Sequence, residues 1–255
     1  MLTGIDHVIA AVGDPDAAAR QIEGELGLEV RDGGRHEAHG TFNRLVWFGD
    51  SYFELISVFD EGRASTSWWG RHVLDILSRA AAGHMGMALA SEGLAADVEL
   101  LRARGSGLGP PEPGERRRTD GRVVRWHLAR AERADPDIGL FFLIERDQGS
   151  AEWTAAERAT RATQAHPLGG PVRLERIEIP VADVRATTMG LHRDVGVAFR
   201  PSLAGDGARD GTVGRQTLRL VSRARRSAPR IALVGGAREV VAELLGYEWE
   251  FRPSV

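Results

Sequence analysis

The sequence contains no cysteine and no lysine among its 255 residues, and each absence excludes a class of chemistry. Without cysteine there are no disulfides, thiolate zinc sites, iron–sulfur clusters or cysteine nucleophiles. Without lysine there is no Schiff-base lysine, no P-loop lysine and no anchor for pyridoxal phosphate. The 33 basic residues are therefore all arginine.

Long apolar runs and strong charge are also missing. No run approaches the length of a membrane span, and the N-terminus enters an expected strand almost at once, so we expect a cytoplasmic protein. The net charge of −3 gives no reason to expect nucleic acid or a membrane as a partner. We expect a small-molecule partner, and the sequence is compatible with a homodimer. The Gly-x-Ser-x-Gly and Gly-x-Gly-x-x-Gly motifs are absent as well.

Two short apolar runs near the N-terminus have strand character, residues 4–10 and 51–57. Because strand side chains alternate, His7 shares a face with Ile5 and Ile9, and Glu54 shares a face with Tyr52 and Ile56. Each run thus carries one ionisable group that needs a partner when buried. A metal ion is one such partner; a hydrogen bond to His7 and an arginine paired with Glu54 are the alternatives.

Residues 1–60 predict one module with the order strand, helix and three strands. Asp14 and Pro15 begin the helix and Gly27 ends it. Gly33-Gly34 is interpreted as a turn. The three later strands are expected at residues 28–31, 42–48 and 52–58.

The pattern returns in residues 83–147, which we interpret as a second module that pairs with the first. An alignment without gaps places His84 on His7, a helix follows at residues 94–103, and strands follow at 122–129 and 140–145. A gapped alternative places Phe142 opposite Glu54. The Arg116-Arg117-Arg118 run, which follows several prolines, is interpreted as a solvated surface turn.

A fainter third copy occupies residues 172–255. Arg176 stands there where His7 and His84 stand in the others, so this copy is expected to have no metal ligand and to act as a packing partner, a lid or an interface. Helices are also expected at residues 72–82 and 152–165. The fold class is therefore α+β, with tandem βαβββ modules pairing into a curved mixed sheet and a third, degenerate module.

This order resembles the glyoxalase-like domains of the vicinal oxygen chelate superfamily, which includes glyoxalases, bleomycin resistance proteins and extradiol dioxygenases. The resemblance covers roughly residues 4–180 and is carried by the segments 6–9, 33–36, 40–43, 52–56 and 120–122 with Trp126. It implies a divalent transition metal held by His7 and Glu54 from the first module and by His84 and Glu145 from the second. Two imidazoles and carboxylates suit Fe, Mn, Ni, Co or Zn. Glu54 and Glu145 are the implied catalytic carboxylates.

The resemblance also implies a substrate-binding rim that contains His36, Asn43 and Trp126, and it favours His36 over His39. Trp68-Trp69 either lines a pocket or closes the end of the sheet. The leading hypothesis is a metal-dependent enzyme that acts on a small substrate with vicinal oxygens, by lyase, isomerase or ring-cleaving dioxygenase chemistry. The alternatives are a metal-free protein of the same fold that binds or sequesters a small molecule, and an interaction module.

Overall fold

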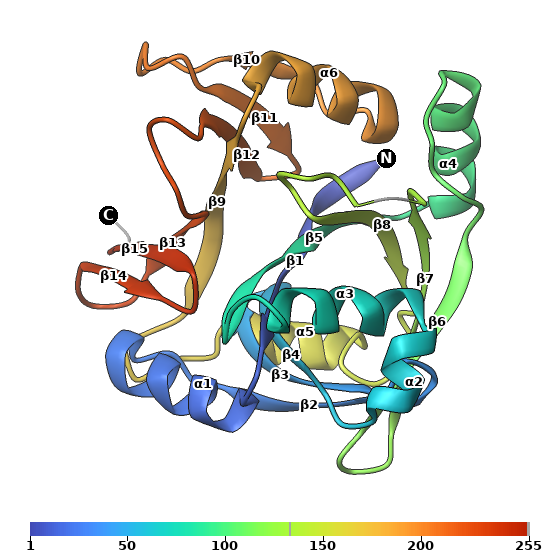
Figure 1. Ribbon diagram of the computed structural model, residues 1–255. Helices are drawn as coiled ribbons and strands as arrows, with labels where there is room; N and C mark the ends of the chain where they lie inside the picture. Colours follow the sequence, from blue (N-terminus) through green and yellow to red (C-terminus); the bar gives the residue numbers. More distant parts are fainter. Residues whose placement is uncertain (133, 254–255) are drawn as a thin grey trace.

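The computed structural model of the chain describes residues 1–132 and 134–253. Its strands form two sheets, an eight-stranded closed barrel and a seven-stranded sheet beside it (Figure 1). The barrel confirms the predicted pairing of two βαβββ modules, and the curved sheet closes fully on itself.

Each half of the barrel is one module whose first and last strands run parallel. The strand order around the barrel is β1-β4-β3-β2-β6-β7-β8-β5, so the first strands of the two modules pair with each other and close the ring. The bounds of the barrel strands are β1 Leu2–Val12, β2 Arg31–His36, β3 Thr41–Phe48, β4 Ser51–Val58, β5 Ala82–Ser91, β6 Glu112–Arg118, β7 Val123–Arg130 and β8 Leu140–Arg146.

One helix follows the first strand of each module. Helix α1 (Pro15–Gln21) begins at Asp14, whose side chain accepts hydrogen bonds from two backbone N–H groups, and it continues as η1 (Ile22–Leu26). Helix α4 (Leu94–Ala103) occupies the corresponding place in the second module. A short turn of helix, η2 (Glu37–His39), lies between β2 and β3.

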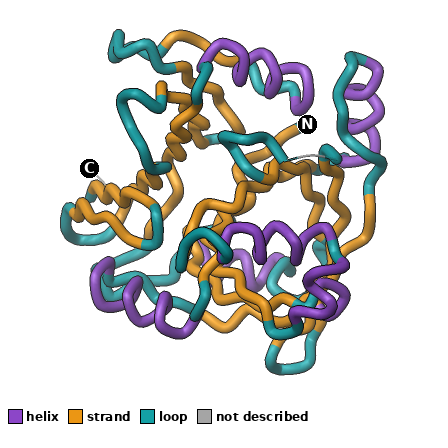
Figure 2. Tube along the Cα trace, in the orientation of Figure 1, coloured by secondary structure: helices purple, strands orange, loops and turns teal. Residues whose placement is uncertain are grey.

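Two further helices, α2 (Glu61–Thr66) and α3 (Trp68–Leu77), connect the modules. Figures 1 and 2 show α3 lying across one end of the ring of strands. Its buried residues Trp69 and Val73 pack with Ile9, Ile56 and Phe142 inside the barrel. Trp69 therefore helps to close the barrel at this end.

The third segment repeats the strand arrangement of the first two. Its first strand again runs parallel to the fourth, in the order β10-β11-β12-β9, and a further set β13-β15-β14 continues the sheet without a helix of its own. The bounds are β9 Val172–Val181, α6 Val184–Val195, β10 Phe199–Pro201, β11 Arg209–Val213, β12 Gln216–Ser222, β13 Arg230–Gly235, β14 Val240–Leu244 and β15 Tyr247–Arg252. Helix α5 (Ala155–Ala162) precedes it.

The second sheet packs against the outer face of the barrel. Ile5 and Phe53 of the barrel share one buried apolar cluster with Ile177 and Trp249 of this sheet. Polar contacts fix the junction, because the Gln216 side chain accepts a hydrogen bond from the backbone N–H of Ile5 (2.5 Å) and donates one to Ser51 Oγ (2.7 Å). Arg176 pairs with Glu178 at 2.8 Å.

Several predicted element boundaries were wrong. The helix expected at 72–82 begins earlier, at Trp68, and ends at Leu77, and the helix expected at 152–165 spans Ala155–Ala162. The strand expected at 28–31 starts only at Arg31.

The predicted turn at Gly33-Gly34 was also wrong, because both glycines lie inside β2. A Cβ atom at Gly34 would lie 2.2 Å from the Arg117 backbone oxygen, so glycine there allows the close approach of the neighbouring strand. No helix in the described ranges is long and apolar enough to cross a membrane.

Candidate functional site

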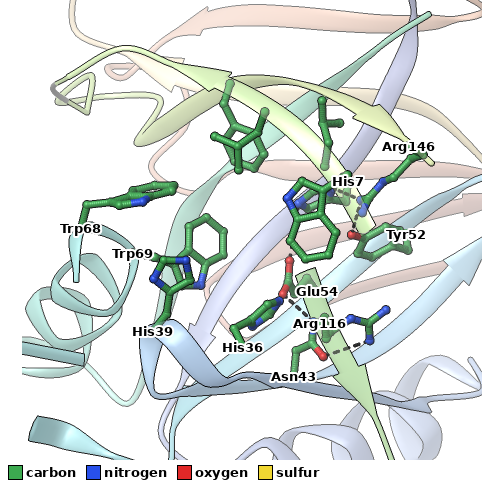
Figure 3. A pocket seen from close by; sticks show the side chains of 14 residues that line it. His7, His36, His39, Asn43, Tyr52, Glu54, Trp68, Trp69, Arg116 and Arg146 are labelled. Carbon is green, nitrogen blue, oxygen red and sulfur yellow. Dashed lines mark hydrogen bonds and ion pairs between the residues drawn. The ribbon is translucent and has the colours of Figure 1, made fainter. Parts of the chain in front are cut away.

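A cavity lies inside the barrel beneath α3, and both modules line it. The first module contributes most of its polar lining, including His7 of β1, Asn43 of β3, and Tyr52 and Glu54 of β4. The second module contributes mainly apolar and aromatic walls. These are Trp126, Leu128, Phe142 and Ile144, and they are joined by the cations Arg116 and Arg146 (Figure 3).

His7 is held from two sides. Its Nδ1 lies 2.5 Å from Asp6 Oδ1, and its ring stacks on the Tyr52 ring, with 4.6 Å between the ring centroids. Nδ1 therefore donates to the carboxylate, and Nε2 points toward Glu54, with 3.5 Å between Nε2 and Oε2. Asp6 fixes the ring orientation and tautomer, as the acidic partner does in a catalytic dyad.

Asp6 is in turn paired with a buried arginine. Arg146 donates to both Asp6 oxygens, at 2.5 and 3.1 Å, and to Tyr52 Oη at 2.7 Å. Burial alone raises the pKa of a carboxyl, yet Arg146 and His7 outweigh it and hold the pKa of Asp6 well below its usual value. Burial raises the pKa of the Tyr52 phenol, which therefore stays protonated.

Glu54 is positioned by a second chain of contacts. Asn43 Nδ2 donates to Glu54 Oε1 at 2.6 Å, while Asn43 Oδ1 accepts from the backbone of Gly34 (2.9 Å) and from Arg116 (3.3 Å). Arg116 also pairs with the buried Glu152 at 2.5 Å. The amide of Asn43 is thereby fixed with its donor facing Glu54.

His36 is a neutral imidazole in the wall of the cavity. Its Nδ1 lies 3.2 Å from Thr41 Oγ1, and its ring packs edge-on against Trp69 and Trp126. Burial, and then the charge of Arg116, lower its pKa well below the ordinary value.

Of the residues selected from the sequence, His7, His36, Asn43, Glu54 and Trp126 all line this cavity. The structure does not bring His84 or Glu145 to it. His84 lies at the junction with the second sheet, where its Nδ1 is 2.6 Å from Tyr247 Oη and its Nε2 donates to the Ile138 carbonyl at 2.9 Å. Glu145 accepts from the backbone N–H of Leu94 at the start of α4, at 3.1 Å.

The register of the strands explains why His84 lies elsewhere. Opposite neighbours on the parallel strands are Ile9 and Glu54 in the first module, and Ala88 and Phe142 in the second. The antiparallel β1–β5 pair has the same symmetry, since Ile9 lies opposite Gly86 and Ala88 opposite His7. Gly86 is therefore the counterpart of His7, and Phe142 that of Glu54, as in the gapped alignment.

His84 stands two residues before Gly86 and is the counterpart of Ile5, with an equivalent register shift in each strand, between Ile5 and His7 and opposite Ile9 and Ala10. Gly86 itself cannot be replaced by a ligand-bearing residue. Its φ is +152°, and an added Cβ would lie 2.0 Å from the Leu140 carbonyl oxygen.

The donor set therefore does not fit the metal centre that the resemblance implies. His7 and Glu54 remain from the four ligands, and the second module offers a glycine and a phenylalanine in the corresponding places. Within residues 1–132 and 134–253, no group of three or more His, Asp or Glu side chains is arranged to hold a metal ion.

Four charged residues of the site were missed by the sequence reasoning. Arg116 was assigned to a solvated turn, but it lies on strand β6 and is 4% exposed. Asp6, Arg146 and Glu152 were not selected at all. The adjacency of Asp6 to His7 was the available signal for the first, and the alternation of β8 through Phe142 and Ile144 was the signal for Arg146.

The sequence model of the glyoxalase-like domain matches residues 5–195, three-quarters of the chain. This chain belongs to the glyoxalase-like domain family. The match confirms the resemblance to the vicinal oxygen chelate superfamily. No curated protein matches the chain.

Solved structures show that the whole architecture recurs. A hypothetical protein from Staphylococcus aureus has 16% identity and a TM-score of 0.80, with 100% of both chains covered. A mutant of 4-hydroxymandelate synthase from Streptomyces coelicolor has 11% identity and a TM-score of 0.58, over 92% of this chain and 71% of its own. A methylmalonyl-CoA epimerase from the same organism has 24% identity and a TM-score of 0.45, over 57% and 98%. At these identities the likeness to the first two structures establishes the fold alone.

Proposed function

We propose that this glyoxalase-like protein is a proton-transfer enzyme, of the isomerase or epimerase class, that acts on a small carbonyl compound. The observation that carries the proposal is the line of contacts from Asp6 through His7 to Glu54 inside the cavity. A His oriented by an Asp and facing a second carboxylate forms a pair of groups that can each hold or release a proton.

His7 and Glu54 would transfer protons to and from the substrate in two steps. One member takes a proton from the carbon next to the carbonyl, and the other returns a proton to the carbon or places one on the oxygen. Asp6 keeps the His7 ring oriented during both events, and Asn43 keeps Glu54 in reach. General acid–base catalysis of this kind contributes a factor of about 10² to 10⁴ in rate.

The test measures proton exchange directly. Chelator-treated protein in D₂O is incubated with acetone, phenylpyruvate and 4-acetylbenzoate, and the loss of protons next to the carbonyl is followed by NMR. We expect exchange above the buffer rate with at least one compound. His7→Asn and Glu54→Gln should each lower that rate about 10²-fold or more. His127→Asn, at an exposed position on the same barrel, is the matched control.

A binding or sequestering protein is the second candidate, and the aromatic walls favour it. Trp68, Trp69 and Trp126 line the same cavity and offer a stacking surface that needs no chemistry. Compounds that bind without exchanging protons would support this function and contradict the first. Exchange that survives His7→Asn unchanged would remove His7 from the reaction.

A further inference from the structure

The cavity has a second polar end, away from His7. Figure 3 shows Trp68, Trp69 and His39 gathered on one side, while His7, Tyr52 and Arg146 lie on the other. Trp68 and Trp69 are the first residues of α3, and His39 ends η2. The proposed proton transfer uses none of these three residues.

Two buried nitrogen atoms that belong to this end have no hydrogen-bond partner among the described residues. They are Nε1 of Trp69 and Nδ1 of His39, and both side chains line the cavity. Trp69 is only 6% exposed. An indole N–H is a donor and nothing else, so a buried one without an acceptor is costly and uncommon. An acceptor oxygen supplied by a ligand would remove that cost.

A positive charge lies beside Trp68, at the same end of the cavity. The guanidinium carbon of Arg130 is 4.2 Å from the centre of the Trp68 ring, and its Nε is also buried without a partner in the described chain. The ion pair of Arg130 with Glu112 is long, at 4.0 Å. Burial, and then the charge of Arg130, lower the pKa of His39, so the positive potential reaches the cavity wall.

Negative charge at this end is missing from the lining. Among the described side chains that line the cavity, Glu54 is the acidic one, and it already contacts Asn43 and His7. Unpaired donors beside a weakly paired guanidinium favour an anionic oxygen over a neutral one.

We propose that the Trp69–His39 end of the cavity is a carboxylate subsite, in which Trp69 Nε1–H and an N–H of His39 donate to the carboxylate of the substrate under the field of Arg130. The orientation of the reacting carbonyl toward His7 and Glu54 rests on the proposed function. The carboxylate subsite and the acid–base pair together define the substrate class as a small planar or aromatic acid, with its carboxylate at one end and its carbonyl at the other. The ring lies against the wall that Trp126 and Phe142 form on the adjacent strands β7 and β8.

The test uses simple probes that bind without reacting. Benzoate and its neutral isostere benzamide are titrated into the full chain by calorimetry. We expect benzoate to bind at least about tenfold more tightly than benzamide, and Trp69→Phe to weaken benzoate about tenfold while leaving benzamide nearly unchanged. Trp68→Phe, the matched change on the neighbouring indole, should cost less than about threefold. Arg130→Gln should reduce the preference for benzoate over benzamide.

The same titrations in a His7→Asn background separate the two proposals. Benzoate should bind there as it does to the unchanged chain, even if no proton exchange is ever detected. The carboxylate subsite is overturned if benzoate fails to bind at millimolar concentration, if benzamide binds equally well, or if Trp69→Phe, shown to be folded by its melting temperature, binds benzoate like the wild type.

Discussion

The two modules of the barrel share a backbone plan and differ at the positions that face the cavity. Where the first module has His7 and Glu54, the second has Gly86 and Phe142 at the corresponding register. The first module therefore supplies the acid–base groups, and the second supplies an aromatic wall. A doubled fold does not imply a doubled set of ligands, because a glycine and a phenylalanine at the corresponding positions are enough to remove half of it.

The largest effect that tests this comparison should come from Gly86→Ala. The left-handed φ and the collision with the Leu140 carbonyl predict a loss of about 3 to 5 kcal/mol in unfolding free energy, measured by urea denaturation. Gly93→Ala is the control, since nothing lies within 4 Å of its added Cβ, and it should cost at most about 1 kcal/mol. A fully stable Gly86→Ala protein would mean that a side chain, and thus a ligand, can stand here.

The next largest effect should come from Arg146→Gln, because it leaves the Asp6 carboxylate buried without its cation. We expect a loss of about 3 kcal/mol at pH 7. Arg125→Gln, in an exposed pair with Glu115 at 3.7 Å, should change stability by less than about 1 kcal/mol.

The pH dependence of Arg146→Gln follows from Asp6. A carboxyl whose folded pKa is depressed stabilises the fold above its unfolded value of 3.8 and loses that contribution as the pH falls through the folded pKa. The acid limb of the stability curve should therefore be shallower in the variant than in the wild type. An unchanged acid limb would show that Asp6 does not depend on Arg146.

A smaller effect is expected at His84, which distinguishes a junction residue from a ligand. Burial lowers its pKa from 6.5 to about 4, so the unfolded chain takes up the proton more readily between these values, and stability falls as the pH drops from 6.5 to 4. His84→Gln should reduce this fall, as measured by melting temperature across the range, with His127→Gln as the control at an exposed position. If His84→Gln instead abolished proton exchange at pH 7 without affecting stability, His84 would belong to the site.

The smallest effect is expected from Phe142→Leu, which keeps the apolar wall and removes the ring that lies 5.6 Å from His7 and 6.0 Å from Trp69. We expect a loss of about 1 kcal/mol and a change of less than tenfold in proton exchange. A fall in the proton-exchange rate as large as that caused by Glu54→Gln would mean that the second module contributes equally to the chemistry.

Much of the fold followed from the sequence because alternation and capping are local signals. The sequence predicted the β1 and β4 strands and the helix cap at Asp14, and it placed His7 and Glu54 on those two strands. The position of His84 was not predicted correctly, because the alignment without gaps is shifted by two residues, and a shift of two keeps the alternation of strand side chains unchanged. Arg116 was hidden for a different reason: prolines and glycines around a charged run indicate a loop, and only tertiary pairing with Glu152 keeps it buried.

The two seams where the modules meet are unequal. Strands β1 and β5 are paired along their length from Leu2 to Val12, whereas β2 and β6 are paired only at Gly34–Arg118 and Arg35–Arg117. The barrel is therefore closed firmly along the β1–β5 seam and only weakly along the short β2–β6 seam. Asn43, which holds Glu54, stands on the strand next to the short seam, and its partner Arg116 stands on the strand across it, so separation of β2 from β6 would leave Asn43 Oδ1 without the Arg116 contact. Amide exchange should be faster at Arg117, beside the short seam, than at Ile9 in the long one, and a bound acid should slow it.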